Sequence, residues 1–81
     1  MGQKMRKRSV TIDGHRTSIS LEDGFWDELS AIAAARRQSL NALVAEVDRA
    51  RVTASPGDGG NLSSALRLHV LQTLRQRLNR G

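Results

Sequence analysis

Residues 15–47 read HRTSISLEDGFWDELSAIAAARRQSLNALVAEV, a short segment with strand character followed by two segments with helical periodicity. The pattern predicts a strand at residues 16–21, a helix at about residues 23–36 and a second helix that begins at Ser39-Leu40-Asn41. A single short strand has no sheet of its own to join, and two such helices cannot bury it alone. A small chain often completes its core by oligomerisation. We therefore expect two copies whose strands pair antiparallel across a two-fold axis.

The composition narrows the possible functions. The chain has 81 residues, no cysteine and two histidines far apart in the sequence, so we expect one small domain with no metal and no cofactor. We expect no enzyme, because no nucleophile is paired with a base. No apolar run approaches the ~18 residues that cross a bilayer, and no apolar segment follows the basic start. These features predict a cytoplasmic protein with no membrane contact.

Positive charge is concentrated at the two ends of the chain, which has a net charge of +5. Residues 62–81 contain four arginines and no acid, and residues 1–8 contain four basic residues and no acid, namely Lys4, Arg6, Lys7 and Arg8. Basic ends around an acidic centre favour a polyanionic partner; ordinary solvated charge is the alternative. Residues 1–7 are predicted to form a flexible basic arm, which either contacts phosphates or is a disordered terminus.

An Asp13-Gly14 pair interrupts an alternating pattern that runs from residue 8 to residue 21. Such a pair between alternating segments is a strong signal for a β-hairpin with a type I′ turn. The hairpin would pair Ile12 with His15, and so on to Arg8 with Ile19. One face would then hold Val10, Ile12, His15, Thr17, Ile19 and Leu21, and the other Ser9, Thr11, Arg16, Ser18 and Ser20. Small hydroxyls beside one arginine suit close approach to base edges; a plain solvent face is the alternative.

The two central helices carry apolar stripes at helical spacing. The first stripe is predicted to contain Phe25, Leu29, Ile32 and Ala33, and the second Leu40, Leu43, Val44 and Val47. Trp26 lies beside the first stripe, as a peripheral core residue or at a subunit boundary. Residues 36–38 join the helices without the glycine that usually ends a helix. The central domain is predicted to span residues 8–53.

A glycine-rich loop is predicted at residues 54–60, followed by a basic amphipathic helix at residues 61–81 that Asn61 or Ser63 caps. This helix would be a third core helix, or it would bind a membrane surface or a partner's groove. Its predicted apolar face contains Leu62, Ala65, Leu66, Val70, Thr73, Leu74 and Leu78. His69 beside that face is expected to be packed and hydrogen-bonded.

Residues 16–47 resemble the ribbon-helix-helix superfamily of the Arc and MetJ repressors. The resemblance lies in the alternating strand Arg16-Thr17-Ser18-Ile19-Ser20-Leu21, in acidic Glu22-Asp23 before the first helix and in Ser39-Leu40-Asn41 before the second. The whole chain is similar to a bacterial subfamily of ribbon-helix-helix DNA-binding proteins, with Gly14-His15-Arg16-Thr17-Ser18 and Phe25-Trp26 as its marks. The implied fold is mostly α with a short β ribbon, an intertwined homodimer with an added hairpin strand and an extra C-terminal helix.

The resemblance also implies a DNA-binding site. The outward strand residues Arg16, Ser18 and Ser20 would read bases in the major groove of double-stranded DNA, and Ser39, Leu40 and Asn41 would hold a phosphate at the helix N-terminus. Lys4, Arg6, Lys7 and Arg8 would contact phosphates. The hairpin is a departure, since a major groove admits a two-stranded ribbon. Either residues 9–12 separate from the ribbon, or DNA docks differently than in the family.

The predicted function is that of a sequence-specific transcriptional regulator, a repressor acting as a homodimer. The alternative is a protein-interaction module, such as an antitoxin or adaptor, that docks through the C-terminal helix. A stable protein partner bound at that helix would favour the protein-interaction module over the transcriptional regulator.

Overall fold

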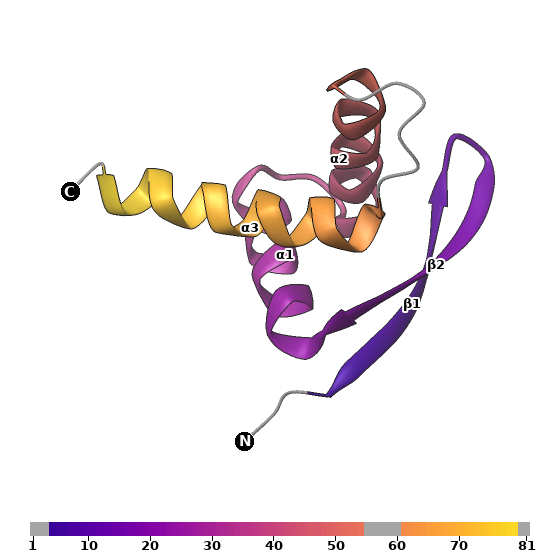
Figure 1. Cartoon of the computed structure of the whole chain (residues 1–81), viewed down its shortest axis with the longest axis horizontal. Helices are drawn as coiled ribbons and strands as arrows, with labels where there is room; N and C mark the ends of the chain where they lie inside the picture. Colours follow the sequence, from indigo (N-terminus) through magenta and orange to yellow (C-terminus); the bar gives the residue numbers. More distant parts are fainter. Residues whose placement is uncertain (1–3, 55–60, 80–81) are drawn as a thin grey trace.

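The fold is a β-hairpin followed by three helices, and the computed structural model describes residues 4–54 and 61–79. The hairpin consists of β1 (Met5–Ile12) and β2 (His15–Glu22), and the helices are α1 (Asp23–Ala35), α2 (Leu40–Ala54) and α3 (Leu62–Asn79). All three helices lie on one side of the hairpin, and its other side is open (Figure 1). This is the predicted ribbon with two helices and an extra C-terminal helix. Residues 55–60, most of the predicted loop, lie outside the described residues.

The hairpin forms in the predicted register. Ile12 pairs with His15, Val10 with Thr17 and Arg8 with Ile19. The turn residues Asp13 and Gly14 have φ angles of 50° and 81°, as a type I′ turn requires. The strand therefore finds its partner within its own chain.

The first strand begins at Met5, whereas we predicted a flexible arm up to residue 7. Three contacts hold this part of the chain against the start of α1. The Trp26 Nε1–H donates to the Arg6 carbonyl at 2.8 Å, and the Asp23 N–H donates to the Lys4 carbonyl at 3.0 Å. The Arg6 guanidinium also lies 3.1 Å from the Asp23 carboxylate. The basic composition of this segment carried no signal for these contacts, because their partners lie far along the chain.

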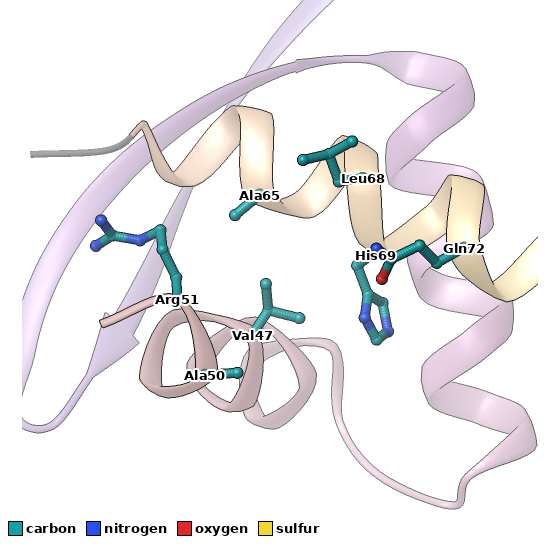
Figure 2. Close-up of a pocket in the computed structure, with 7 residues that line it drawn as sticks. All are labelled: Val47, Ala50, Arg51, Ala65, Leu68, His69 and Gln72. Carbon is teal, nitrogen blue, oxygen red and sulfur yellow. The ribbon is translucent and has the colours of Figure 1, made fainter. Parts of the chain in front are cut away.

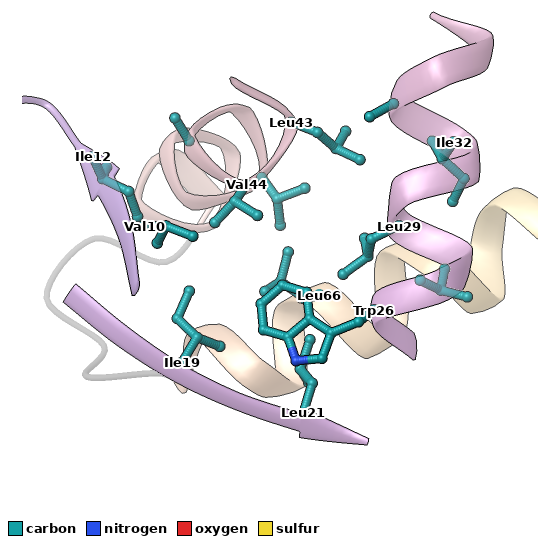
Figure 3. Packing of buried hydrophobic residues seen from close by; sticks show 14 residues of the cluster. Val10, Ile12, Ile19, Leu21, Trp26, Leu29, Ile32, Leu43, Val44 and Leu66 are labelled. Atoms are coloured by element: carbon teal, nitrogen blue, oxygen red, sulfur yellow. The ribbon is translucent and has the colours of Figure 1, made fainter. Parts of the chain in front are cut away.

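The core lies between the inner face of the hairpin and the three helices (Figure 3). The hairpin contributes Val10, Ile12, Ile19 and Leu21, whereas His15 and Thr17 at the same face are exposed. In α1 the buried aromatic residue is Trp26, only 2% exposed, and Phe25 is half-buried. The predicted order of these two is thus reversed, because the indole must face β1 to reach the Arg6 carbonyl.

The third helix belongs to the core through its first half. Leu66 and Val70 are buried among residues of the hairpin and the other helices, which confirms a third core helix. Asn61 is its cap, since the Asn61 Oδ1 accepts a hydrogen bond from the Ser63 N–H at 2.8 Å. The predicted apolar face continues beyond the core, where Leu74 and Leu78 are 36% and 79% exposed.

A groove of about 340 Å³ separates α2 from α3, and His69 lies on its α3 side (Figure 2). Partial burial and the nearby Arg36 lower the pKa of His69, while Glu46 opposes this shift. We expected a hydrogen-bonded histidine, but among the described residues its buried Nε2 has no hydrogen-bond partner.

Arginine takes the place of glycine in the turn between α1 and α2. Arg37 has a φ of 56°, in the left-handed region. The Arg37 N–H donates to the Ala34 carbonyl and the Gln38 N–H to the Ala33 carbonyl, both at 3.0–3.1 Å. These bonds form a Schellman motif, so the turn keeps the usual geometry of a glycine-capped helix end.

Replacing Arg37 with glycine should therefore stabilise the fold. A left-handed conformation costs a non-glycine residue about 1–2 kcal/mol, and glycine loses up to about 1 kcal/mol of that gain through chain entropy. We expect the Arg37→Gly variant to unfold roughly 2–8 °C above the wild type in a circular dichroism melt. Arg37→Ala loses the same charge without relieving the backbone and is the control. Equal melting temperatures for the two variants would contradict this account.

Candidate nucleic-acid interface

Apart from the terminal Met5–Glu22 pair, the open side of the hairpin presents six side chains from two adjacent strands. They form three cross-strand pairs: Lys7 with Ser20, Ser9 with Ser18, and Thr11 with Arg16. Five of the six are exposed and Ser20 is half-buried. Figure 1 shows no helix over this side. We call these six residues the outer ribbon face. The predicted base contacts Arg16, Ser18 and Ser20 all belong to it.

Arg16 is free to bind a ligand. Among the described residues it takes part in none of the ion pairs, which engage Arg6, Arg36, Arg49, Arg51 and Arg67. A guanidinium group on an exposed strand, flanked by small hydroxyl side chains, can approach a planar acceptor pair without losing an internal contact.

The four predicted phosphate contacts near the N-terminus divide into two groups. Lys4 is exposed just before β1, and Lys7 belongs to the outer ribbon face. Arg6 and Arg8 face the helices instead: Arg6 pairs with Asp23, and the Arg8 guanidinium lies 5.5 Å from the centre of the Trp26 ring. The side chains of Arg6 and Arg8 thus already have partners within the chain. Lys4 and Lys7 take part in none of the ion pairs between described residues.

The N-terminus of α2 lies against the edge of β1. The Ser39 Oγ accepts the Ala42 N–H at 3.0 Å, so Ser39 is the helix cap. The Asn41 side chain reaches β1 and bonds both backbone groups of Thr11, accepting from its N–H at 2.8 Å and donating to its carbonyl at 2.7 Å. Leu40 is half-buried. The three residues predicted to hold a phosphate therefore lie beside the ribbon, with Asn41 as the link.

Two contacts join α3 to the edge of β2, and sequence analysis missed both. The Ser63 Oγ donates to the Ser20 carbonyl at 3.1 Å, and the Arg67 Nε lies 3.0 Å from the Glu22 carboxylate. A hydrogen bond from its own backbone and the Arg67 guanidinium lower the pKa of Glu22. No local signal could have revealed them, because 43 and 45 residues separate the partners.

The described residues offer little for other chemistry. Residues 4–54 and 61–79 contain no group of three or more side chains that could hold a metal ion. None of the helices in this part of the chain is long and apolar enough to cross a membrane.

A two-stranded ribbon followed by paired helices defines a class of small domains, and comparison with known families places the chain in it. Residues 5–74 match the ribbon-helix-helix domain, so the chain belongs to that family, whose members are generally DNA-binding regulators without catalytic activity. No curated protein matches the chain.

Among solved structures, an uncharacterized protein from Bordetella pertussis Tohama I is similar, with a TM-score of 0.83 and 28% sequence identity. The match covers 95% of this chain and 61% of that chain, so this chain spans under two thirds of its relative's length.

Replacing Asn41 with alanine should loosen α2 from the ribbon. The change removes two hydrogen bonds and leaves the Thr11 N–H and carbonyl to water, which should lower the free energy of unfolding by about 1–2 kcal/mol. Urea denaturation followed by circular dichroism measures this loss. Asn79→Ala, at an exposed position at the end of α3, should stay within about 0.5 kcal/mol of the wild type. Equal effects of the two changes would show that the Asn41 contacts do not hold the fold.

Proposed function

We propose that this protein is a sequence-specific DNA-binding transcriptional regulator, a bacterial repressor that acts as a homodimer in the cytoplasm. The proposal follows from membership of the ribbon-helix-helix family together with the outer ribbon face. Its main support is the free Arg16 on an exposed strand beside small hydroxyl side chains. A sheet face that contacts only solvent does not require an unpaired arginine beside small hydroxyl side chains.

The strand residues would supply sequence preference. An arginine can donate two hydrogen bonds to the O6 and N7 atoms of guanine, the commonest specific contact in the major groove. Arg16 would make this contact, with Ser18 and Ser20 beside it. A serine hydroxyl can accept a hydrogen bond from any base or donate one to it. Most of the discrimination between bases would therefore come from Arg16.

The remaining predicted contacts would hold the DNA backbone. Lys4 and Lys7 would neutralise phosphates from exposed positions. Arg6 and Arg8 would contribute less to phosphate binding, because their guanidinium groups already contact Asp23 and the Trp26 ring. At the start of α2, Ser39, Leu40 and Asn41 would bring a helix N-terminus, and its partial positive charge, to a phosphate beside the ribbon.

Arg16→Ala should abolish most of the sequence preference. We expect the wild type to bind its own upstream DNA more tightly than scrambled DNA, with affinity that falls steeply between about 50 and 200 mM salt, in the manner typical of phosphate contacts. In Arg16→Ala the ratio of the two affinities should fall roughly tenfold. Fluorescence anisotropy titration measures both affinities at each salt concentration.

Arg75→Ala is the matched control, because it removes the same charge from an exposed position on α3. This variant should keep the affinity ratio of the wild type. An unchanged ratio in Arg16→Ala would exclude its role in reading bases. Equal and weak binding of the wild type to both DNAs would count against sequence-specific regulation as a whole.

A second candidate function is a protein-interaction module that docks through α3. The observation in its favour is the exposed leucine series in the second half of this helix, where Leu71, Leu74 and Leu78 are 44%, 36% and 79% exposed. Arg75 and Arg77 flank these leucines and residues 62–79 contain no acid, so the partner would offer an apolar groove with an acidic rim.

A double change, Leu71→Gln with Leu78→Gln, separates the two candidates. Both side chains are exposed, so the variant should fold and keep the DNA affinity of the wild type if DNA binding is the function. If docking is the function, the same variant should lose a purified partner encoded next to this chain's gene, measured by isothermal titration calorimetry.

A further inference from the structure

We infer that the hairpin of a single chain is the complete DNA-reading ribbon, and that Ser9 and Thr11 of β1 contact bases together with Arg16 and Ser18 of β2. The inference rests on the proposed function and deepens it. It differs from the arrangement expected from the sequence, in which two copies share one ribbon and each copy contributes a single strand. A homodimer would then carry two complete ribbons.

The first argument is that one chain already presents two strands of reading residues. In the pairs Ser9–Ser18 and Thr11–Arg16, a small hydroxyl side chain of β1 lies directly opposite a predicted base contact of β2. Cross-strand partners lie on one face with their Cβ atoms about 5 Å apart. Any groove that Arg16 and Ser18 enter must therefore admit Thr11 and Ser9 as well.

The second argument concerns the edges of the ribbon, where a strand from another copy would have to pair. On β1, the Asn41 side chain occupies both backbone groups of Thr11. On β2, the Ser63 hydroxyl occupies the Ser20 carbonyl, and the first turn of α3 lies beside it. A strand added to β2 would have to displace Ser63 and break the adjacent Arg67–Glu22 ion pair.

The third argument is that the inner face of the ribbon needs no second copy. Ile19 and Leu21 of β2 are 5% and 0% exposed within a single chain. α3 packs against β2, and its Leu66 is fully buried in the same hydrophobic cluster. The apolar surface that would otherwise drive two ribbons together is therefore already buried.

The fourth argument is one of width. Strands in a sheet lie about 4.8 Å apart, so the outer two of four strands are separated by roughly 14 Å. The major groove is about 12 Å wide and admits a two-stranded ribbon. The single hairpin fits this groove, whereas a four-stranded ribbon made from two hairpins does not.

A pair of threonines on opposite faces of the hairpin allows a matched test. Thr11 lies on the outer ribbon face and Thr17 on the inner one, and both are exposed. The wild type is first used to select its preferred duplex from a randomised pool. Affinities for that duplex and for single-base variants of it are then measured for Thr11→Ala, Ser9→Ala, Arg16→Ala and the control Thr17→Ala.

We expect Thr11→Ala and Ser9→Ala each to change the preference at one or two base positions by roughly threefold or more, at positions adjacent to those that Arg16→Ala affects. Thr17→Ala should leave every position unchanged. If only Arg16→Ala changes the base preference, the ribbon is not the single hairpin, although the proposed function stands. If the selection yields no preferred duplex, the proposed function fails, and this inference fails with it.

A second measurement does not depend on DNA. The chain has no cysteine, so one introduced cysteine is unique. A shared ribbon would bring the middle of β2 next to its counterpart in the other copy, and Ser18→Cys would then form a disulfide-linked dimer on mild oxidation. We expect Ser18→Cys to cross-link no faster than Ser30→Cys, an exposed control on α1. Cross-linking at least tenfold faster at position 18 would overturn the inference.

Discussion

Burial of the hairpin's inner face is the constraint on which the rest of this structure depends. A two-stranded hairpin is marginal in water unless a hydrophobic face packs on something else. Here α3 packs against β2 and adds the fully buried Leu66 to the same hydrophobic cluster. Each buried side chain of this kind contributes roughly 1.5–3 kcal/mol, and small domains are stable by only about 5–15 kcal/mol in total. The third helix is therefore needed for the ribbon to persist in one chain.

Trp26 connects this core to the basic N-terminal segment. Its indole is buried, its N–H bonds the Arg6 carbonyl, and its ring faces the Arg8 guanidinium. These contacts convert a segment with arm-like composition into the first half of β1. They also separate the basic residues by direction, because alternate residues of a strand face opposite sides. Arg6 and Arg8 are held near the helices, while Lys7 stays on the open side.

Local sequence patterns predicted the strands and helices, whereas contacts between residues far apart in the sequence determine how these elements are joined. The Asp13-Gly14 turn and the alternation around it fixed the hairpin register, because the turn and the apolar face require the same pairing. Ser39 as the helix cap was readable for the same local reason. Nothing near Asn41 or Ser63 indicates that these side chains bond strand edges 30 and 43 residues away. The sequence predicted the outer ribbon face, but only Arg16, Ser18 and Ser20 of β2 as its base contacts, because no local pattern shows that Asn41 and Ser63 bond the two edges of the ribbon.

A ribbon made from one chain has a consequence for the DNA that it can read. When two identical strands share a ribbon, the two-fold axis passes through it, and the bases under it tend to follow the same symmetry. In this hairpin the two strands differ: Thr11 lies opposite Arg16, and Lys7 lies opposite Ser20. The DNA sequence that a single ribbon reads therefore need not be symmetric. Symmetry in an operator would then reflect how two whole copies are arranged, with one asymmetric half for each.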